Sequence, residues 1–153
     1  MNNAAVAGAT GTARETASLS AFIRTNTSKG GSGGDPTVSG GVVNAARTDG
    51  TQRAFTEALL KPVLQAVFTQ GGEPTMLMVG PFNKTQVSGF AGIAAQRYMA
   101  PSDSATTIIG AADVYLSDFG EVRITPNRFQ RERDAYILNP DLLSLAVLRP
   151  IQN

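Results

Sequence analysis

Apolar residues recur at helical spacing soon after residue 55. They are Leu59, Leu60, Val63, Leu64, Val67 and Phe68. This spacing places them on one broad face of a helix. Thr56 is a suitable N-cap, and the two glycines at 71 and 72 end the helix. Pro62 interrupts the pattern, so we expect a kink there or a helix that starts near it.

Shorter apolar segments follow, separated by turn residues. The continuous apolar run Met76–Val79 predicts a buried strand. Asn83 is suited to cap a second helix that extends to about Ala95. Ser117–Gly120 has the composition of a hairpin turn, because glycine can take the positive φ that closes it. Five further segments are short, bounded by turn residues and rich in β-branched or apolar residues, which predicts strands; they are Thr106–Ile109, Asp113–Leu116, Glu121–Thr125, Ala135–Leu138 and Leu145–Leu148.

Residues 1–50 differ from the rest of the chain. They hold nine of the 16 glycines and a single aromatic residue, Phe22. This is too little large apolar surface to offset the entropy of ordering, so we expect no independent core there. One short helix is predicted within Thr16–Ile23, with Leu19, Phe22 and Ile23 on a common face. Residues 29–41 are rich in glycine, and we expect them to lack regular secondary structure and to be mobile unless a neighbour covers them.

Together these patterns predict an α+β fold in two parts. Residues 1–50 would form a Gly-rich, extended and flexible segment with one short helix, and residues 51–153 would form an α+β domain. Apolar periodicity predicts the core of that domain, which comprises Leu60, Leu64, Val67, Met78, Val79, Val114, Ile124, Ile137 and Val147.

Composition narrows the function. The chain has no His and no Cys, which excludes a Ser-His-Asp mechanism, thiolate chemistry and the usual zinc and copper ligands. The net charge of +1 provides no overall basic field for nucleic acid. Only 16% of residues are charged, which indicates a protein that buries surface against other protein. We predict no catalytic site, no cofactor site and no metal site.

Two short motifs resemble catalytic signatures. Gly30–Gly34 satisfies G-x-S-x-G, but its flanks are Gly-rich and a nucleophile elbow requires a histidine base. Asp118-Phe119-Gly120 spells the kinase magnesium motif, yet the other kinase motifs are missing from the sequence. We interpret the first as a flexible loop and the second as a hairpin turn. The sequence also has neither a basic leader followed by an apolar stretch nor an apolar run near ~20 residues, so we expect no signal peptide and no membrane segment.

The candidate functional residues are a cluster of arginines. Arg123, Arg128, Arg131 and Arg133 fall within eleven residues and are interleaved with Phe129, Glu132 and Asp134. The cluster has three interpretations: a solvated loop with local ion pairs, a contact with carboxylates of another subunit, or a contact with nucleic-acid phosphate. A protein partner is favoured over nucleic acid because no second basic stripe is present. We expect inter-subunit contacts from Arg123, Arg128, Phe129, Arg131 and Arg133, with Phe129 as the apolar anchor.

Several blocks of residues stand out in order over residues 56–150. They are Gly71-Gly-Glu-Pro-Thr, Met78-Val-Gly-Pro-Phe-Asn-Lys84, Val87-Ser-Gly-Phe90, Asp113-Val-Tyr-Leu-Ser-Asp-Phe-Gly120, Pro126-Asn-Arg-Phe-Gln-Arg131, Leu138-Asn-Pro140 and Leu148-Arg-Pro150. In this order the blocks resemble the major capsid proteins of certain tailed bacteriophages. The N-terminal third, through Asn2-Asn-Ala-Ala-Val-Ala-Gly8 and Thr12-Ala-Arg14, is weakly similar as well.

The resemblance implies the Hong Kong 97-like capsid fold and a non-enzymatic subunit that assembles into the pentamers and hexamers of an icosahedral shell. It implies copies of the chain as partners, with scaffold, portal or decoration proteins besides, packaged DNA contacted only non-specifically, and assembly in the host cytoplasm before residence in the virion. Such subunits also carry an N-terminal arm, an extended loop and a spine helix, which we do not find, so we expect a fragment or a reduced relative. The alternative is another virion component: a head-completion, decoration or tail protein.

Overall fold

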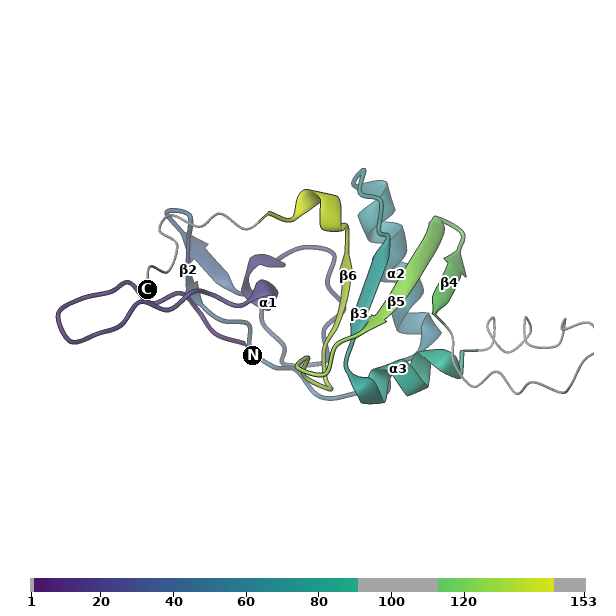
Figure 1. The fold of residues 1–153 in the computed structure, drawn as a ribbon, viewed down its shortest axis with the longest axis horizontal. Helices are drawn as coiled ribbons and strands as arrows, with labels where there is room; N and C mark the ends of the chain where they lie inside the picture. Colours follow the sequence, from purple (N-terminus) through teal and green to yellow (C-terminus); the bar gives the residue numbers. More distant parts are fainter. Residues whose placement is uncertain (1, 91–112, 145–153) are drawn as a thin grey trace, which may run out of the picture.

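A four-stranded mixed sheet forms the centre of the molecule (Figure 1). The computed structural model describes residues 2–90 and 113–144. Its strands are β3 (Met76–Val79), β4 (Val114–Ser117), β5 (Gly120–Pro126) and β6 (Ala135–Leu138). Their order across the sheet is β4-β5-β3-β6. Strand β3 runs parallel to β5 and antiparallel to β6, and β4 pairs antiparallel with β5. The predicted α+β class is confirmed.

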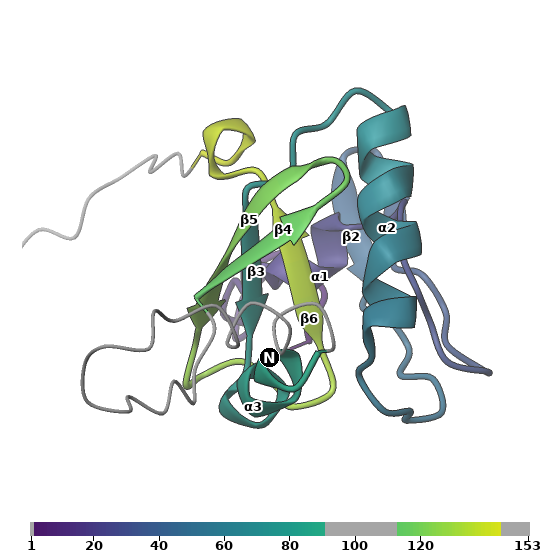
Figure 2. The same cartoon turned by 90° about the vertical axis from the view of Figure 1, so that its right-hand side faces the viewer.

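Helix α2 (Glu57–Thr69) lies along one face of this sheet (Figure 2). It begins five residues before Pro62, so the expectation of a start near the proline is wrong. Leu60 and Leu64 of α2 pack into the main core with Leu77 of β3. This core contains nine buried residues, which are Leu60, Leu64, Leu77, Val79, Val87, Phe90, Tyr115, Val122 and Ile124.

Helix α3 (Pro81–Ser88) closes one end of the sheet after β3 (Figure 1). It begins two residues before the predicted cap, because Pro81 suits the first helical position and Gly80 takes the N-cap. Asn83 is therefore not a cap. Its buried side chain instead donates a 2.6 Å hydrogen bond to the carbonyl of Glu132.

Strand alternation decides which predicted core residues are buried. Leu60, Leu64, Val79 and Ile124 are buried as expected. The prediction that Val114 is buried is wrong, because Val114 is 39% exposed. Neighbouring residues of a strand face opposite sides of the sheet, and in β4 it is Tyr115 that faces the core. Val67, Met78 and Ile137 are only half-buried. Val147 lies outside the described residues, as do the strands expected at Thr106–Ile109 and Leu145–Leu148.

The predicted hairpin turn is confirmed at the junction of β4 and β5. Ser117 pairs with Gly120, which leaves Asp118 and Phe119 as a two-residue loop. Gly120 has a φ of +126°, a region open to glycine and strained for other residues. A short 3-10 helix, η2 (Pro140–Leu142), follows β6.

The N-terminal region has more structure than its composition predicts. It contains α1 (Leu19–Phe22) and a hairpin of β1 (Thr37–Ser39) and β2 (Val42–Ala45). The expectation that residues 29–41 lack regular secondary structure is wrong, since β1 lies within them. A glycine pair with positive φ, Gly40 and Gly41, forms the turn, and glycine pairs between β-branched residues are typical of such hairpins.

The small core of this region also differs from the prediction. It consists of Ala17, Ala21 and Val43. Phe22 is 59% exposed, so the predicted Leu19–Phe22–Ile23 face is not the buried one. The reason is the length of α1: in a single turn of four residues only Ser20 and Ala21 are buried, Ala21 against Val43 of β2 and Ser20 beside Asn2 and Ser18.

The Gly-rich stretch is a close crossing of two chain segments. The Thr51 N–H donates to the Gly31 carbonyl at 2.7 Å, and Gly34 and Thr48 exchange backbone hydrogen bonds of 3.2 Å. A Cβ atom at Gly50 would lie 2.6 Å from the Gly30 carbonyl oxygen, closer than side-chain atoms approach. Glycine is needed here for close approach rather than for flexibility.

Candidate functional site

Three arginines of the cluster, Arg128, Arg131 and Arg133, lie in the loop between β5 and β6, which we call the arginine loop. Backbone and amide contacts fix the shape of this loop. The Asn127 carboxamide oxygen accepts a 3.0 Å hydrogen bond from the Phe129 N–H, a local turn that asparagine favours. The Gln130 side chain donates to the Met78 carbonyl at 3.0 Å and to the Asp134 carbonyl at 2.8 Å. The loop is thereby attached to β3, and its side chains project from a defined backbone.

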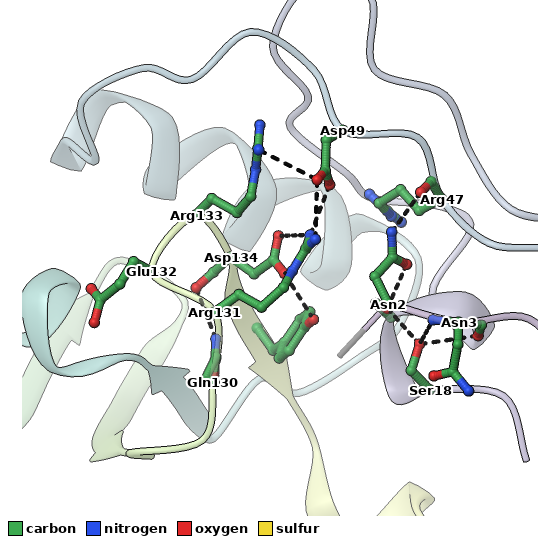
Figure 3. Close-up of polar contacts among 12 residues, drawn as sticks. Asn2, Asn3, Ser18, Arg47, Asp49, Gln130, Arg131, Glu132, Arg133 and Asp134 are labelled. Carbon is green, nitrogen blue, oxygen red and sulfur yellow. Dashed lines mark hydrogen bonds and ion pairs between the residues drawn. The ribbon is translucent and has the colours of Figure 1, made fainter.

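Arg131 binds two carboxylates of its own chain (Figure 3). Its two terminal nitrogens donate to the two oxygens of Asp49 at 3.0 and 2.8 Å. Its Nε and Nη2 donate to Asp134 at 2.7 and 3.2 Å. The planar guanidinium fork matches both carboxylates, which makes these contacts stronger than ordinary neutral hydrogen bonds.

Arg133 completes the same group from the other side of Asp49. It lies 3.3 Å from an Asp49 carboxylate oxygen and donates a 2.7 Å hydrogen bond to the Gly50 carbonyl. We call Asp49, Arg131, Arg133 and Asp134 the Asp49 clamp. It joins the segment that leaves the N-terminal region to the loop before β6.

The charges of the clamp stabilise one another. The hydrogen bond from Arg131 holds the pKa of Asp49 below its ordinary value, against a smaller opposing effect of desolvation. Hydrogen bonds to Asp134 and Asp49 raise the pKa of Arg131 in turn. Next to the clamp, burial is the main cause of a raised pKa at Tyr136, with the charge of Asp134 second.

The other three predicted residues point elsewhere. Phe129 is 86% exposed, and Arg128 beside it is exposed with no hydrogen bond or ion pair to any residue in 2–90 or 113–144. Arg123 is exposed on β5, where it lies opposite Val114 of β4 and Met76 of β3, on the sheet face away from α2. The five residues predicted as one contact surface thus fall into an intrachain clamp, an exposed tip and a sheet face.

Sequence analysis missed Asp49. The Asp134 partner was visible as a neighbour of Arg131, whereas Asp49 is 82 residues away. The only local signal was Thr48-Asp49-Gly50, which indicates a turn without indicating what the carboxylate contacts.

A groove of about 740 Å³ lies between α2, β6 and the segment 23–28. Leu59, Val63 and Val67 form its wall along α2, with Ile137 and Leu138 on β6, which explains why Val67 is only half-buried. Among the described residues no three acidic side chains gather as metal ligands would.

The longest helix in the described part of the chain is α2, with 13 residues, and none there is long and apolar enough to cross a membrane. The family model described as SU10 major capsid protein matches residues 1–153. No curated protein matches the chain.

Proposed function

The chain belongs to the SU10 major capsid protein family, and from that premise we propose how it serves as a shell subunit. It is a structural component of a bacteriophage virion, and its partners are first of all copies of itself. We propose that these copies form the pentamers and hexamers of an icosahedral shell around the genome. The observation that carries the proposal is the family match over the whole length of the chain.

The Hong Kong 97-like fold is part of this proposal. The mixed sheet with α2 on one face, and α3 at one end, is compatible with the axial domain of such a subunit. We propose further that the chain divides near residue 51, because the small N-terminal core and the main core have no residue in common. Limited proteolysis that cuts first between residues 45 and 56 would support this division.

The arginine loop is proposed to meet protein rather than DNA. Two of its three arginines, Arg131 and Arg133, pair with acidic side chains of the same chain, so their charge is already neutralised. We propose that Arg123, Arg128, Phe129, Arg131 and Arg133 lie at subunit boundaries, with Arg128 and Phe129 making direct contacts and Arg131 and Arg133 holding the loop. Packaged DNA would be contacted only non-specifically.

Electron microscopy of the full gene product, expressed alone and with its phage partners, tests the proposal. We expect closed particles of uniform size, with assembly in the host cytoplasm and with scaffold, portal or decoration proteins as candidate additional partners. Analytical ultracentrifugation measures the fraction assembled. Small soluble oligomers under every condition, with no particle by either method, would contradict the role in a shell.

A further inference from the structure

Two exposed patches at opposite ends of β5 have complementary chemistry. The first is the pair Arg128 and Phe129, which follows β5, and we call it the tip. The second surrounds the turn before β5. It is a hollow of about 350 Å³, and we call it the Asp118 hollow; its lining residues are Lys61, Pro62, Leu64, Gln65, Ser117, Asp118 and Phe119.

The hollow offers an aromatic surface beside a carboxylate. Phe119 lines the hollow, and the ring of Phe68, which is 50% exposed, lies against it with the two ring centroids 5.1 Å apart. Asp118 is exposed, and its carboxylate has no hydrogen bond or ion pair with any described residue. The nearby cation, Lys61, is already paired with Glu57 at 3.0 Å. A cation arriving with an aromatic ring would therefore find one free carboxylate and a surface to stack on.

The tip presents those two groups in adjacent positions. Phe129 is the most exposed of the large apolar residues that the structure describes, at 86%, and the Arg128 guanidinium pairs with none of the described residues. A cavity of ~150 Å³ already holds a benzene molecule, so the hollow is large enough for a phenyl ring. The tip would bring a positive charge to Asp118 and a ring to the Phe68–Phe119 pair.

The contact cannot form within one chain. β5 has seven residues between the two patches, and a strand rises ~3.3 Å per residue, which separates them by roughly 20 Å. Figure 1 shows the turn before β5 and the loop after it at opposite ends of the sheet. Because a major capsid protein associates with copies of itself, we take the occupant to be a second copy. The donor and acceptor patches differ, so the contact is head-to-tail, the type that generates a closed ring where the rotation between copies closes.

We propose that the tip of one subunit inserts into the Asp118 hollow of the next copy, with Phe129 against Phe68 and Phe119 and with Arg128 paired to Asp118. This inference rests on the proposed function, since it takes a second copy of the chain as the partner, and it names the contact that the proposed function leaves open. Charge pairs of this kind determine the register and specificity of a contact more than its affinity.

Charge reversal tests the pairing. Arg128→Asp and Asp118→Arg should each lower the assembled fraction about tenfold or more, and the double variant should restore it towards the wild type. Arg24→Asp makes the same charge change on an exposed arginine outside both patches and should assemble normally. Phe129→Ala should assemble poorly, with Phe22→Ala, a similarly exposed phenylalanine, as its control. Circular dichroism must show that each variant is folded.

Cross-linking tests the contact even where no shell closes. The chain has no cysteine, so we would mix Arg128→Cys with Asp118→Cys, add a short bismaleimide and identify the product by mass. A cross-linked pair is expected in this mixture, about tenfold above the mixture of Arg128→Cys with Arg24→Cys. No enrichment, or single charge reversals that assemble normally, would overturn the inference. Absence of wild-type particles beside an enriched cross-link would instead count against the closed shell alone.

Discussion

The sheet body and the N-terminal region are held together by different means. The core of the sheet body contains nine buried residues, including the large side chains Leu64, Leu77 and Val122. The N-terminal core contains three, two of which are alanines. Since stabilisation follows the apolar area removed from water, the sheet body is expected to hold most of the stability. The N-terminal region must depend on polar contacts and on its attachment to the sheet body.

Those polar contacts are concentrated around the first residues and α1 (Figure 3). The Asn2 amide donates to the Arg47 carbonyl at 2.6 Å, and the Ser18 hydroxyl lies 2.9 Å from that of Ser20. Arg47 in turn donates to the Ile23 carbonyl. Each such bond contributes ~0.5–1.5 kcal/mol net, so the region is expected to open before the sheet body does.

The largest effect is expected from Leu64→Ala. Leu64 is fully buried between α2 and the sheet, and truncating a buried leucine costs about 2–5 kcal/mol through lost transfer energy and the cavity left behind. Urea unfolding followed by circular dichroism should show this loss over the whole transition. A loss under 1 kcal/mol would mean that the main core is not centred on α2.

Val43→Ala is expected to cause the next largest loss of stability. It removes two methyl-sized groups from the small core at about 0.8 kcal/mol each, or ~1.6 kcal/mol. Hydrogen exchange should show lost protection in β1 and β2 with β3 and β5 unchanged. Equal loss in the sheet body would show that the two regions unfold as one unit, and the comparison drawn above would fail.

Arg131→Met breaks the attachment between the regions. The ion pairs of Arg131 are partly exposed, so we expect the free energy of unfolding to fall by about 1 kcal/mol. Amide hydrogen exchange at residues 48–51 should also become faster. Arg128→Met removes the same charge three residues earlier, at a side chain with no partner among the described residues, and should change stability by less than ~0.5 kcal/mol. Identical effects of both substitutions would contradict an intrachain clamp.

Acid should weaken the attachment in a defined direction. The pKa of Asp49 is lowered below its ordinary 3.8 by Arg131, so its contribution is present above that pH and is lost as the pH falls through the lower, folded-state pKa. The stability difference between wild type and Asp49→Asn should be full near pH 7 and shrink below pH ~4. Urea titrations at several pH values measure it. If the stability difference between wild type and Asp49→Asn grew as the pH fell, the stabilising role of the Asp49 carboxylate would be contradicted.

Val114→Thr is expected to have the smallest effect. Val114 lies on the sheet face away from α2 and is 39% exposed, so a substitution of similar shape should stay within ~0.5 kcal/mol. Tyr115→Phe is the informative companion, because it removes a 2.9 Å hydrogen bond to Glu57. A large loss at Val114 would mean that this face is covered in the folded protein.

Periodicity predicted the elements well where one face of an element meets a single core. α2 ends near the predicted glycines, β3 and β6 have the predicted bounds, and the Ser117–Gly120 turn was recognised from its glycine. Val114 was misplaced because a continuous apolar run does not reveal which alternate residues face inwards. For Val67 the cause is that helical spacing does not distinguish a core face from a groove wall.

The functional cluster was predictable in its position but not in its contacts. Four arginines within eleven residues marked this segment as important, while the pairing of Arg131 with Asp49 depends on how two distant segments fold together. The structure of the Gly-rich stretch was not predicted for a related reason. Its composition suggested a linker, but glycine is required at positions 30 and 50 because two backbones cross there and leave no room for a side chain.

The position of β3 in the sheet constrains how the protein emerges from the ribosome. β3 pairs on one side with β5 and on the other with β6, through Met76 opposite Arg123 and Leu138. Both partners are synthesised later, the second by roughly 60 residues, which at ~5–20 residues per second is a delay of about 3–12 s. Before β5 is made, Leu77 and Val79 have only α2 and α3 to cover them. A nascent chain stalled between β3 and β5 would therefore expose a strand with two open edges, and one stalled between β5 and β6 would expose a strand with one.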